Sequence, residues 1–167
     1  EVSAPNTYSG LYGMKSFPFH TDMAHWRLPP RYLMLRCVVG FEEVPTLLTE
    51  GLALAKEVGL DFLARAIVRP RRPINGKFPL LRIYQPKDED AILRWDDVFF
   101  LPASQVGEQA VALFRQAVHA CSPQKIALAK PGDTLIIDNW RMLHARTSVP
   151  TGCEGRKIER AYIGELH

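Results

Sequence analysis

The chain has 167 residues, of which 47% are hydrophobic and 23% are charged. This length and composition predict one soluble globular domain and exclude an intrinsically disordered chain. The net charge of +3 is too small to indicate a nucleic-acid partner. No apolar run approaches the roughly 20 residues needed to cross a bilayer, so a membrane protein is excluded as well.

The first third of the chain predicts extended pieces, then a strand and then a helix. Residues 1–19 predict extended pieces and turns that lead to His20. A run rich in β-formers between Pro30 and Gly40 predicts a strand over 31–39. Thr46 stands at N-cap distance from an apolar run that predicts a helix over 47–59.

The remaining elements complete a mainly β pattern with helical insertions. They are a short helix at 61–67, strands at 78–84 and within 93–101, a helix at 105–120, and strands at 125–129, 134–138, 144–149 and 157–166. Strands at both ends with helices between them indicate an α+β domain or an all-β barrel with inserted helices. No βαβ alternation, GxGxxG or P-loop is present, which disfavours a doubly wound nucleotide-binding sheet.

The cysteine pattern indicates the redox compartment. Cys37, Cys121 and Cys153 are far apart and form no CxxC pair. An odd and scattered set argues against a disulfide framework and against a zinc knuckle. We therefore expect a reducing, cytoplasmic location.

Two motifs together offer a metal-ligand set. His20 and Asp22 are two residues apart, so on an extended backbone their side chains project to the same face. His144 follows the segment GDTLIIDNWRML, in which an apolar strand ends in a turn. Two imidazoles and one carboxylate make the facial triad of a non-haem Fe(II) site, which leaves adjacent positions open for a cosubstrate and oxygen.

The final predicted strand carries two arginines on one face. In RKIERAY every second residue points to the same face of a strand, so the two arginines share a face with Ile158 and Tyr162. Guanidinium groups on a core-facing side are costly unless an anion meets them. A dicarboxylate is a natural partner because the planar guanidinium binds carboxylates bidentately.

This ordered set of motifs resembles the Fe(II)- and 2-oxoglutarate-dependent oxygenases of the taurine dioxygenase (TauD/TfdA-like) family. The resemblance extends from about Asn6 to Ile163 and is weakest between Gly59 and Val118. The segments that support it are HTD at 20–22, PPRYLMLRCV at 29–38, Thr46, GDTLIIDNWRMLHAR at 132–146, Arg156 and Arg160. DNWRMLHAR followed by RKIERAY is also similar to the γ-butyrobetaine hydroxylase branch.

The resemblance implies a double-stranded β-helix, a distorted jelly roll with its ligands near one open end. It implies that His20, Asp22 and His144 bind Fe(II), and that Thr46 hydrogen-bonds the distal carboxylate of 2-oxoglutarate. An arginine of the last strand then pairs with the same carboxylate. The taurine dioxygenase pattern favours Arg160 for this role, which is our preference, and the γ-butyrobetaine hydroxylase pattern favours Arg156.

The activity implied is an oxidoreductase that consumes 2-oxoglutarate and O2 and releases succinate and CO2. It hydroxylates or desaturates a small-molecule metabolite, because the carboxylate of Asp22 argues against a halogenase. Two alternatives remain open: a jelly-roll metal protein that uses no keto acid, and a catalytically inert binding or sensing member of the fold. Since 167 residues are few for this family, we expect a single domain, 1–167, that lacks an N-terminal leader and some loop residues.

Residues near these motifs are further candidates for the substrate pocket. Arg94, Asp96 and Asp97 form a charged group inside an apolar segment, and we expect them to line the pocket. Asn6, Tyr8 and Tyr12 precede the metal motif and are candidates to face the substrate.

Overall fold

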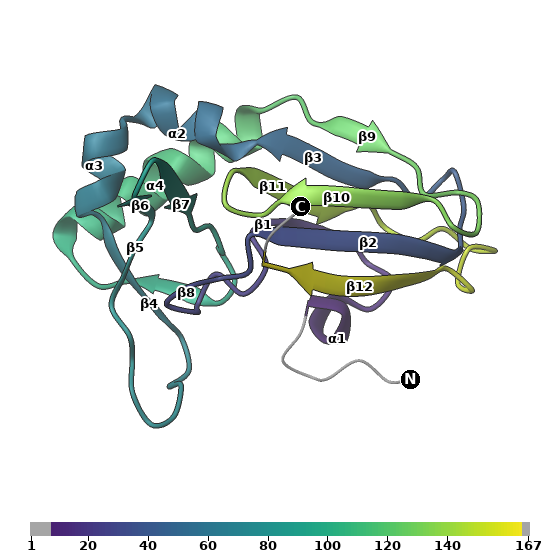
Figure 1. Ribbon diagram of the computed structural model, residues 1–167, viewed down its shortest axis with the longest axis horizontal. Helices are drawn as coiled ribbons and strands as arrows, with labels where there is room; N and C mark the ends of the chain where they lie inside the picture. Colours follow the sequence, from purple (N-terminus) through teal and green to yellow (C-terminus); the bar gives the residue numbers. More distant parts are fainter. Residues whose placement is uncertain (1–7, 165–167) are drawn as a thin grey trace.

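Two facing antiparallel sheets and a helical end make up the fold, which a computed structural model describes over residues 8–164 (Figure 1). The β3 sheet has the order β1 (Phe17–His20), β11 (Met142–Arg146), β3 (Thr46–Glu50) and β9 (Gln124–Ile126). The β2 sheet has the order β10 (Thr134–Asp138), β2 (Tyr32–Val39) and β12 (Lys157–Ile163). This arrangement agrees with the mainly β fold predicted from the sequence. Asn6 and the last two residues of the predicted strand 157–166 lie outside the described residues.

An apolar cluster fills the space between the two sheets. Strand β2 alternates, with Leu33, Leu35 and Cys37 buried while the residues between them are less buried or exposed. These three side chains pack with Leu48 of β3 and Ile137 of β10. The run of β-formers thus forms the predicted strand, and its alternating burial places one of its faces on the core.

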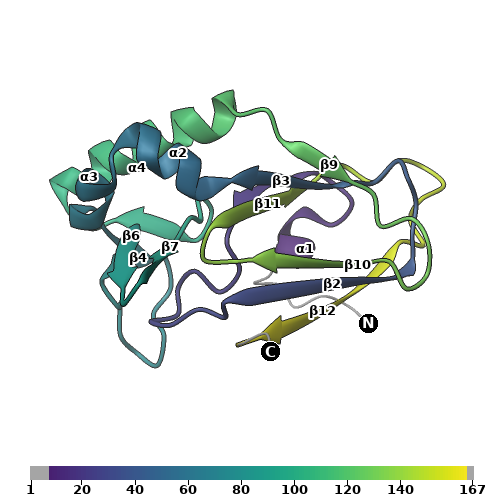
Figure 2. The ribbon, with the colours of Figure 1, turned by 45° about the horizontal axis from the view of Figure 1, so that its top comes forward.

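The helices gather at one end of the two sheets, where they build a second core (Figure 2). Helices α2 (Gly51–Val58), α3 (Leu60–Arg65) and α4 (Gln105–Ala120) pack there with short strands. The short strands are β4 (Ile67–Pro70), β5 (Leu81–Arg82), β6 (Tyr84–Lys87), β7 (Asp90–Leu93) and β8 (Phe100–Pro102). A short helix, α1 (Tyr8–Tyr12), precedes β1, so the prediction of extended pieces and turns before His20 is wrong over these five residues. No helix in the described part of the chain is long and apolar enough to cross a membrane.

Helix α4 has the boundaries predicted from its apolar spacing. Ser104 is its N-cap, and its hydroxyl accepts a hydrogen bond from the Gly107 N–H at 2.9 Å. Ala110, Phe114 and Val118 are buried at four-residue spacing, which places one face of the helix on the core.

Phe114→Ala is expected to destabilise the protein by about 3–5 kcal/mol, the usual cost of truncating a buried phenylalanine. The Phe114 side chain is fully buried, and its ring lies 4.8 Å from that of Trp95 in an edge-on contact. The matched control is Leu113→Ala, because the neighbouring Leu113 is 46% exposed. Chemical denaturation measures both free energies of unfolding, and equal losses in the two variants would contradict the prediction.

The helix predicted over 47–59 is wrong in its first half. Residues Thr46–Glu50 form strand β3, and helix α2 begins only at Gly51. Strand β3 pairs with β11 on one side and with β9 on the other, so tertiary pairing overrides the local helical pattern. Gly51 allows the close approach at this junction, because a Cβ there would lie 2.8 Å from Leu143 Cγ.

Other strand boundaries also differ from the predicted ones. The predicted strand 78–84 is divided between β5 and β6, and the segment within 93–101 forms only the end of β7 and the start of β8. Strand β11 begins at Met142 rather than at His144 and ends at Arg146. Strand β11 pairs with β1 and β3, which are distant in the sequence, whereas β6 and β7 pair with each other as a local hairpin.

Candidate metal centre

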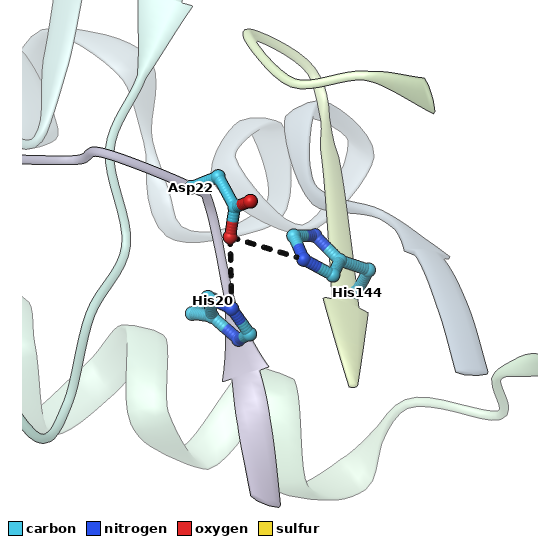
Figure 3. A group of neighbouring side chains, drawn as sticks. All are labelled: His20, Asp22 and His144. Atoms are coloured by element: carbon cyan, nitrogen blue, oxygen red, sulfur yellow. Dashed lines mark ion pairs between the residues drawn. The ribbon is translucent and has the colours of Figure 1, made fainter. Parts of the chain in front are cut away.

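Strand pairing in the β3 sheet brings the two predicted histidine ligands together. His20 of β1 and His144 of β11 are direct partners in the antiparallel register, so their side chains project from the same face. Their ring centroids are 4.3 Å apart, and the two residues are 1% and 2% exposed. Asp22 follows the end of β1 by two residues and is buried beside them (Figure 3).

The three side chains converge on one point. Asp22 Oδ1 lies 3.2 Å from His20 Nε2 and 3.3 Å from His144 Nε2 (Figure 3). All three ligand atoms lie within 4.8 Å of one another. Neither Nε2 atom has a hydrogen-bond partner among the described residues, although both are buried. Unpartnered buried nitrogens that face a carboxylate oxygen fit a divalent metal ion.

The surroundings favour the protonation states that a metal requires. His20 Nδ1 lies 3.0 Å from the Pro18 carbonyl oxygen, so a proton on Nδ1 leaves the Nε2 lone pair for a metal. Burial, together with the charge of His20, lowers the pKa of His144 to about 4. Burial alone would raise the pKa of Asp22, but His144, His20 and the Arg160 charge hold it well below its usual range. A neutral imidazole and an ionised carboxylate are therefore present at neutral pH.

The second oxygen of Asp22 is held from the other sheet. Arg160 Nη1 lies 2.9 Å from Asp22 Oδ2, and the Tyr162 hydroxyl donates to the same oxygen at 3.0 Å. Both side chains come from β12. The two carboxylate oxygens thus have different neighbours: Oδ1 faces the histidines, and Oδ2 faces two donors.

Asn139 fixes the backbone of the loop that carries Asp22. The Asp22 N–H donates to Asn139 Oδ1 at 2.7 Å, and Asn139 Nδ2 donates to the Asp22 and Pro30 carbonyl oxygens, each at 2.9 Å. The next residue, Trp140, donates from Nε1 to the Pro29 carbonyl oxygen at 3.0 Å. The sequence indicated a turn at DNW, but it gave no signal for these contacts with a loop more than 100 residues away.

Tyr8 packs directly on the metal centre. Its ring stacks on His20 with centroids 3.9 Å apart, and its hydroxyl donates to Asp96 Oδ1 at 2.9 Å. Asp96 also accepts the N–H groups of Val98 and Phe99. We expected Tyr8 to face the substrate. In the structure its ring covers the His20 ring, and the hydrogen bond to Asp96 holds it there.

The other members of the charged group have structural roles. Arg94 is fully buried and donates to the Arg27 carbonyl oxygen at 2.7 Å and to Gln85 Oε1 at 2.9 Å. Asp97 forms an ion pair with Arg115 of α4. Neither Arg94 nor Asp97 lines the cavity beside the metal ligands.

That cavity has a volume of about 1130 Å³ and contains the predicted cosubstrate residues. Thr46, Arg156 and Arg160 line it together with His144 and Arg146. Thr46 is buried and is the register partner of Arg146. The structure thus brings all the residues predicted for cosubstrate binding to the space beside the metal ligands.

Arg156 lies in this cavity without a counter-ion among the described residues. Its Nε is buried and unpartnered, and so is the Nε of Arg146. Burial and the charge of Arg146 lower the pKa of Arg156. Two neighbouring guanidinium groups that lack a carboxylate form an environment suited to an anion.

Comparison with known proteins places these features in a family context. The family described as "Taurine catabolism dioxygenase TauD, TfdA family" matches residues 71–162, more than half of the chain. Clavaminate synthase 2 of Streptomyces clavuligerus is 29% identical over 160 residues, which cover 87% of this chain and 49% of that protein.

Solved structures with the same fold include two iron oxygenases. Asparagine oxygenase in complex with Fe(II), 2S,3S-3-hydroxyasparagine and succinate has a TM-score of 0.73 at 20% identity, over 96% of this chain and 53% of that one. The non-haem iron oxygenase OrfP with Fe and alpha-ketoglutaric acid has a TM-score of 0.72 at 21% identity, over 90% and 50%. These similarities confirm the predicted double-stranded β-helix. The chain spans about half the length of the proteins that it matches.

Proposed function

The chain belongs to the TauD, TfdA family, and on that premise we propose that it is an Fe(II)- and 2-oxoglutarate-dependent dioxygenase acting on a small molecule. The main observation is the convergence of His20, Asp22 and His144, whose ligand atoms lie within 4.8 Å of one another. The iron in the asparagine oxygenase and OrfP structures, with succinate or alpha-ketoglutaric acid, supports this proposal.

His20 Nε2, Asp22 Oδ1 and His144 Nε2 are the atoms that would hold the metal. Iron bound by such a set supplies the oxidative chemistry, with O2 as oxidant and conversion of 2-oxoglutarate to succinate and CO2. The protein contributes orientation and exclusion of water. Tyr8 covers the His20 ring, and all three ligand residues are buried.

The contacts favour Arg156 over Arg160 as the partner of the distal carboxylate. Arg160 is engaged with Asp22 at 2.9 Å, next to the metal position. The distal carboxylate of 2-oxoglutarate lies at the far end of the molecule from its metal-chelating end. Arg156 lies four residues earlier, immediately before β12 begins at Lys157, and it forms no ion pair with Asp22 in the described part of the chain.

Arg156 also has the better environment for that carboxylate. Its guanidinium is near Arg146, the register partner of Thr46, so a hydroxyl and two positive charges gather in one part of the cavity. A carboxylate there would accept charge-assisted hydrogen bonds from Arg156 and a hydrogen bond from Thr46. We therefore assign Thr46 and Arg156 to the distal carboxylate.

Amino acids are the first substrate class to test. The asparagine oxygenase structure contains a hydroxyasparagine, and OrfP structures contain a hydroxy-L-arginine or L-canavanine. We also infer a cytoplasmic location, because Cys37, Cys121 and Cys153 are all free thiols.

Anaerobic titration with Fe(II) followed by 2-oxoglutarate tests the proposal. We expect a weak visible charge-transfer band that appears only when both are present, and succinate release once O2 is admitted, screened first with amino acids. Metal binding without a response to 2-oxoglutarate would favour a jelly-roll metal protein that uses no keto acid. If the charge-transfer band appears but no succinate is released, not even slowly and uncoupled from substrate oxidation, the result would favour an inert binding or sensing protein.

A further inference from the structure

We propose that Tyr162 is a positioning residue that, together with Arg160, holds Asp22 so that only Oδ1 faces the metal. This inference rests on the proposed function, because it concerns how Asp22 would bind the iron. Tyr162 has no part in the assignments made above for the metal or for 2-oxoglutarate.

The two carboxylate oxygens of Asp22 have different neighbours. Asp22 Oδ2 receives the Tyr162 hydroxyl at 3.0 Å and Arg160 Nη1 at 2.9 Å. Asp22 Oδ1 lies 3.2 and 3.3 Å from the two unpartnered histidine nitrogens. A carboxylate can bind a metal through one oxygen or through both. Two donors on Oδ2 favour binding through Oδ1 alone.

The support of Asp22 is rigid. Arg160 and Tyr162 are two residues apart on β12, so their side chains share one face of the strand, and both also reach solvent. Their register partners on β2 are Leu35 and Leu33, both buried in the core. Asp22 itself is fixed through its backbone by Asn139. The contact of Arg160 and Tyr162 with Asp22 therefore links the two sheets. The two donors belong to the β2 sheet, and Asp22 follows β1, a strand of the β3 sheet.

The two donors have different roles on the same oxygen. Arg160 brings a positive charge that compensates the carboxylate, whereas Tyr162 brings a neutral hydroxyl whose direction is set by its ring. Removal of the hydroxyl leaves the charge balance intact and loosens only the orientation of Asp22. An Asp22 that can rotate could occupy a second metal position, one that the keto acid or O2 needs.

The test compares Tyr162→Phe with wild type by titration of the metal-free protein with Co(II) alone. We expect the variant to bind Co(II) about 10- to 100-fold more weakly, the usual effect of losing a partner of a metal ligand. We also expect a changed visible absorption spectrum of the bound Co(II), which reports its coordination and would not respond to a purely structural role. Tyr84→Phe is the matched control, because Tyr84 lies in β6, outside the metal centre.

The outcomes separate this inference from the proposed function. Wild-type affinity and an unchanged Co(II) spectrum in Tyr162→Phe would overturn the inference and leave the proposed function standing. Failure of the wild-type protein to bind Co(II) would overturn both. Thermal unfolding of the metal-free proteins should show equal stability for Tyr162→Phe and wild type. A large loss of stability with an unchanged Co(II) spectrum would reduce Tyr162 to a structural residue and also refute the inference.

Discussion

Asp22→Ala is expected to abolish tight Fe(II) binding and, with it, all succinate formation. Asp22 Oδ1 is the only carboxylate oxygen among the three grouped ligand atoms. Its loss leaves His20 and His144 beside the positive charge of Arg160, which repels a cation. Because loss of a mere partner of a ligand costs about 10- to 100-fold in metal affinity, loss of the ligand should cost more than about 100-fold. Anaerobic calorimetry with Fe(II) measures the change.

Asp97→Ala is the matched control for this experiment. Asp97 is a nearby acid, but its carboxylate pairs with Arg115 of α4 and takes no part in the metal centre. We expect it to keep wild-type Fe(II) affinity. Asp22→Asn provides a second test with nearly unchanged shape, in case the alanine variant folds poorly. Wild-type Fe(II) affinity in both Asp22 variants would show that the metal centre lies elsewhere.

The local part of the metal centre could be predicted from the sequence. The two-residue spacing of His20 and Asp22 predicted a shared face on an extended chain, and this rule needs no knowledge of the fold. In the structure Asp22 lies in the turn after β1, and its carboxylate still meets His20. His144 is more than 120 residues away, and it was joined to the pair by its ligand type and by the family resemblance rather than by any local rule. The pairing of β1 with β11, which makes His20 and His144 direct neighbours, depends on the register of two distant strands. Local patterns do not determine that register.

Residues that support the centre from other strands were not predictable in the same way. Tyr162 was placed on the same face as Arg160, but its contact with Asp22 depends on how the β2 sheet faces the β3 sheet. Asn139 looked like a turn residue, and its bonds to the Asp22 loop arise only in the folded chain. The strand at Thr46–Glu50 was not predicted for the same reason, since the two strands that pair with it come from the last third of the chain.

Arg156→Ala is expected to weaken 2-oxoglutarate binding by about 10- to 150-fold while Fe(II) affinity stays at the wild-type value. A hydrogen bond to a charged group contributes about 1.5–3 kcal/mol, which corresponds to that range. Arg156 lines the cavity but forms no hydrogen bond or ion pair with Asp22, His20 or His144 in the described part of the chain, so its removal should leave the metal ligands in place. Titration of the anaerobic Fe(II) protein with 2-oxoglutarate measures the effect through the visible band.

Arg160→Ala should show the opposite pattern, because Arg160 contacts Asp22 Oδ2 at 2.9 Å. We expect weaker Fe(II) binding in this variant and, once the protein is saturated with Fe(II), a smaller change in 2-oxoglutarate affinity than in Arg156→Ala. Arg36→Ala controls for the loss of one positive charge, since Arg36 is exposed on β2. The reverse result, in which Arg160→Ala weakens 2-oxoglutarate binding and Arg156→Ala leaves it unchanged, would assign the distal carboxylate to Arg160. Arg160 lies in β12 and Arg156 immediately before it, and both line one cavity. Their contacts distinguish them, and these variants test that distinction directly.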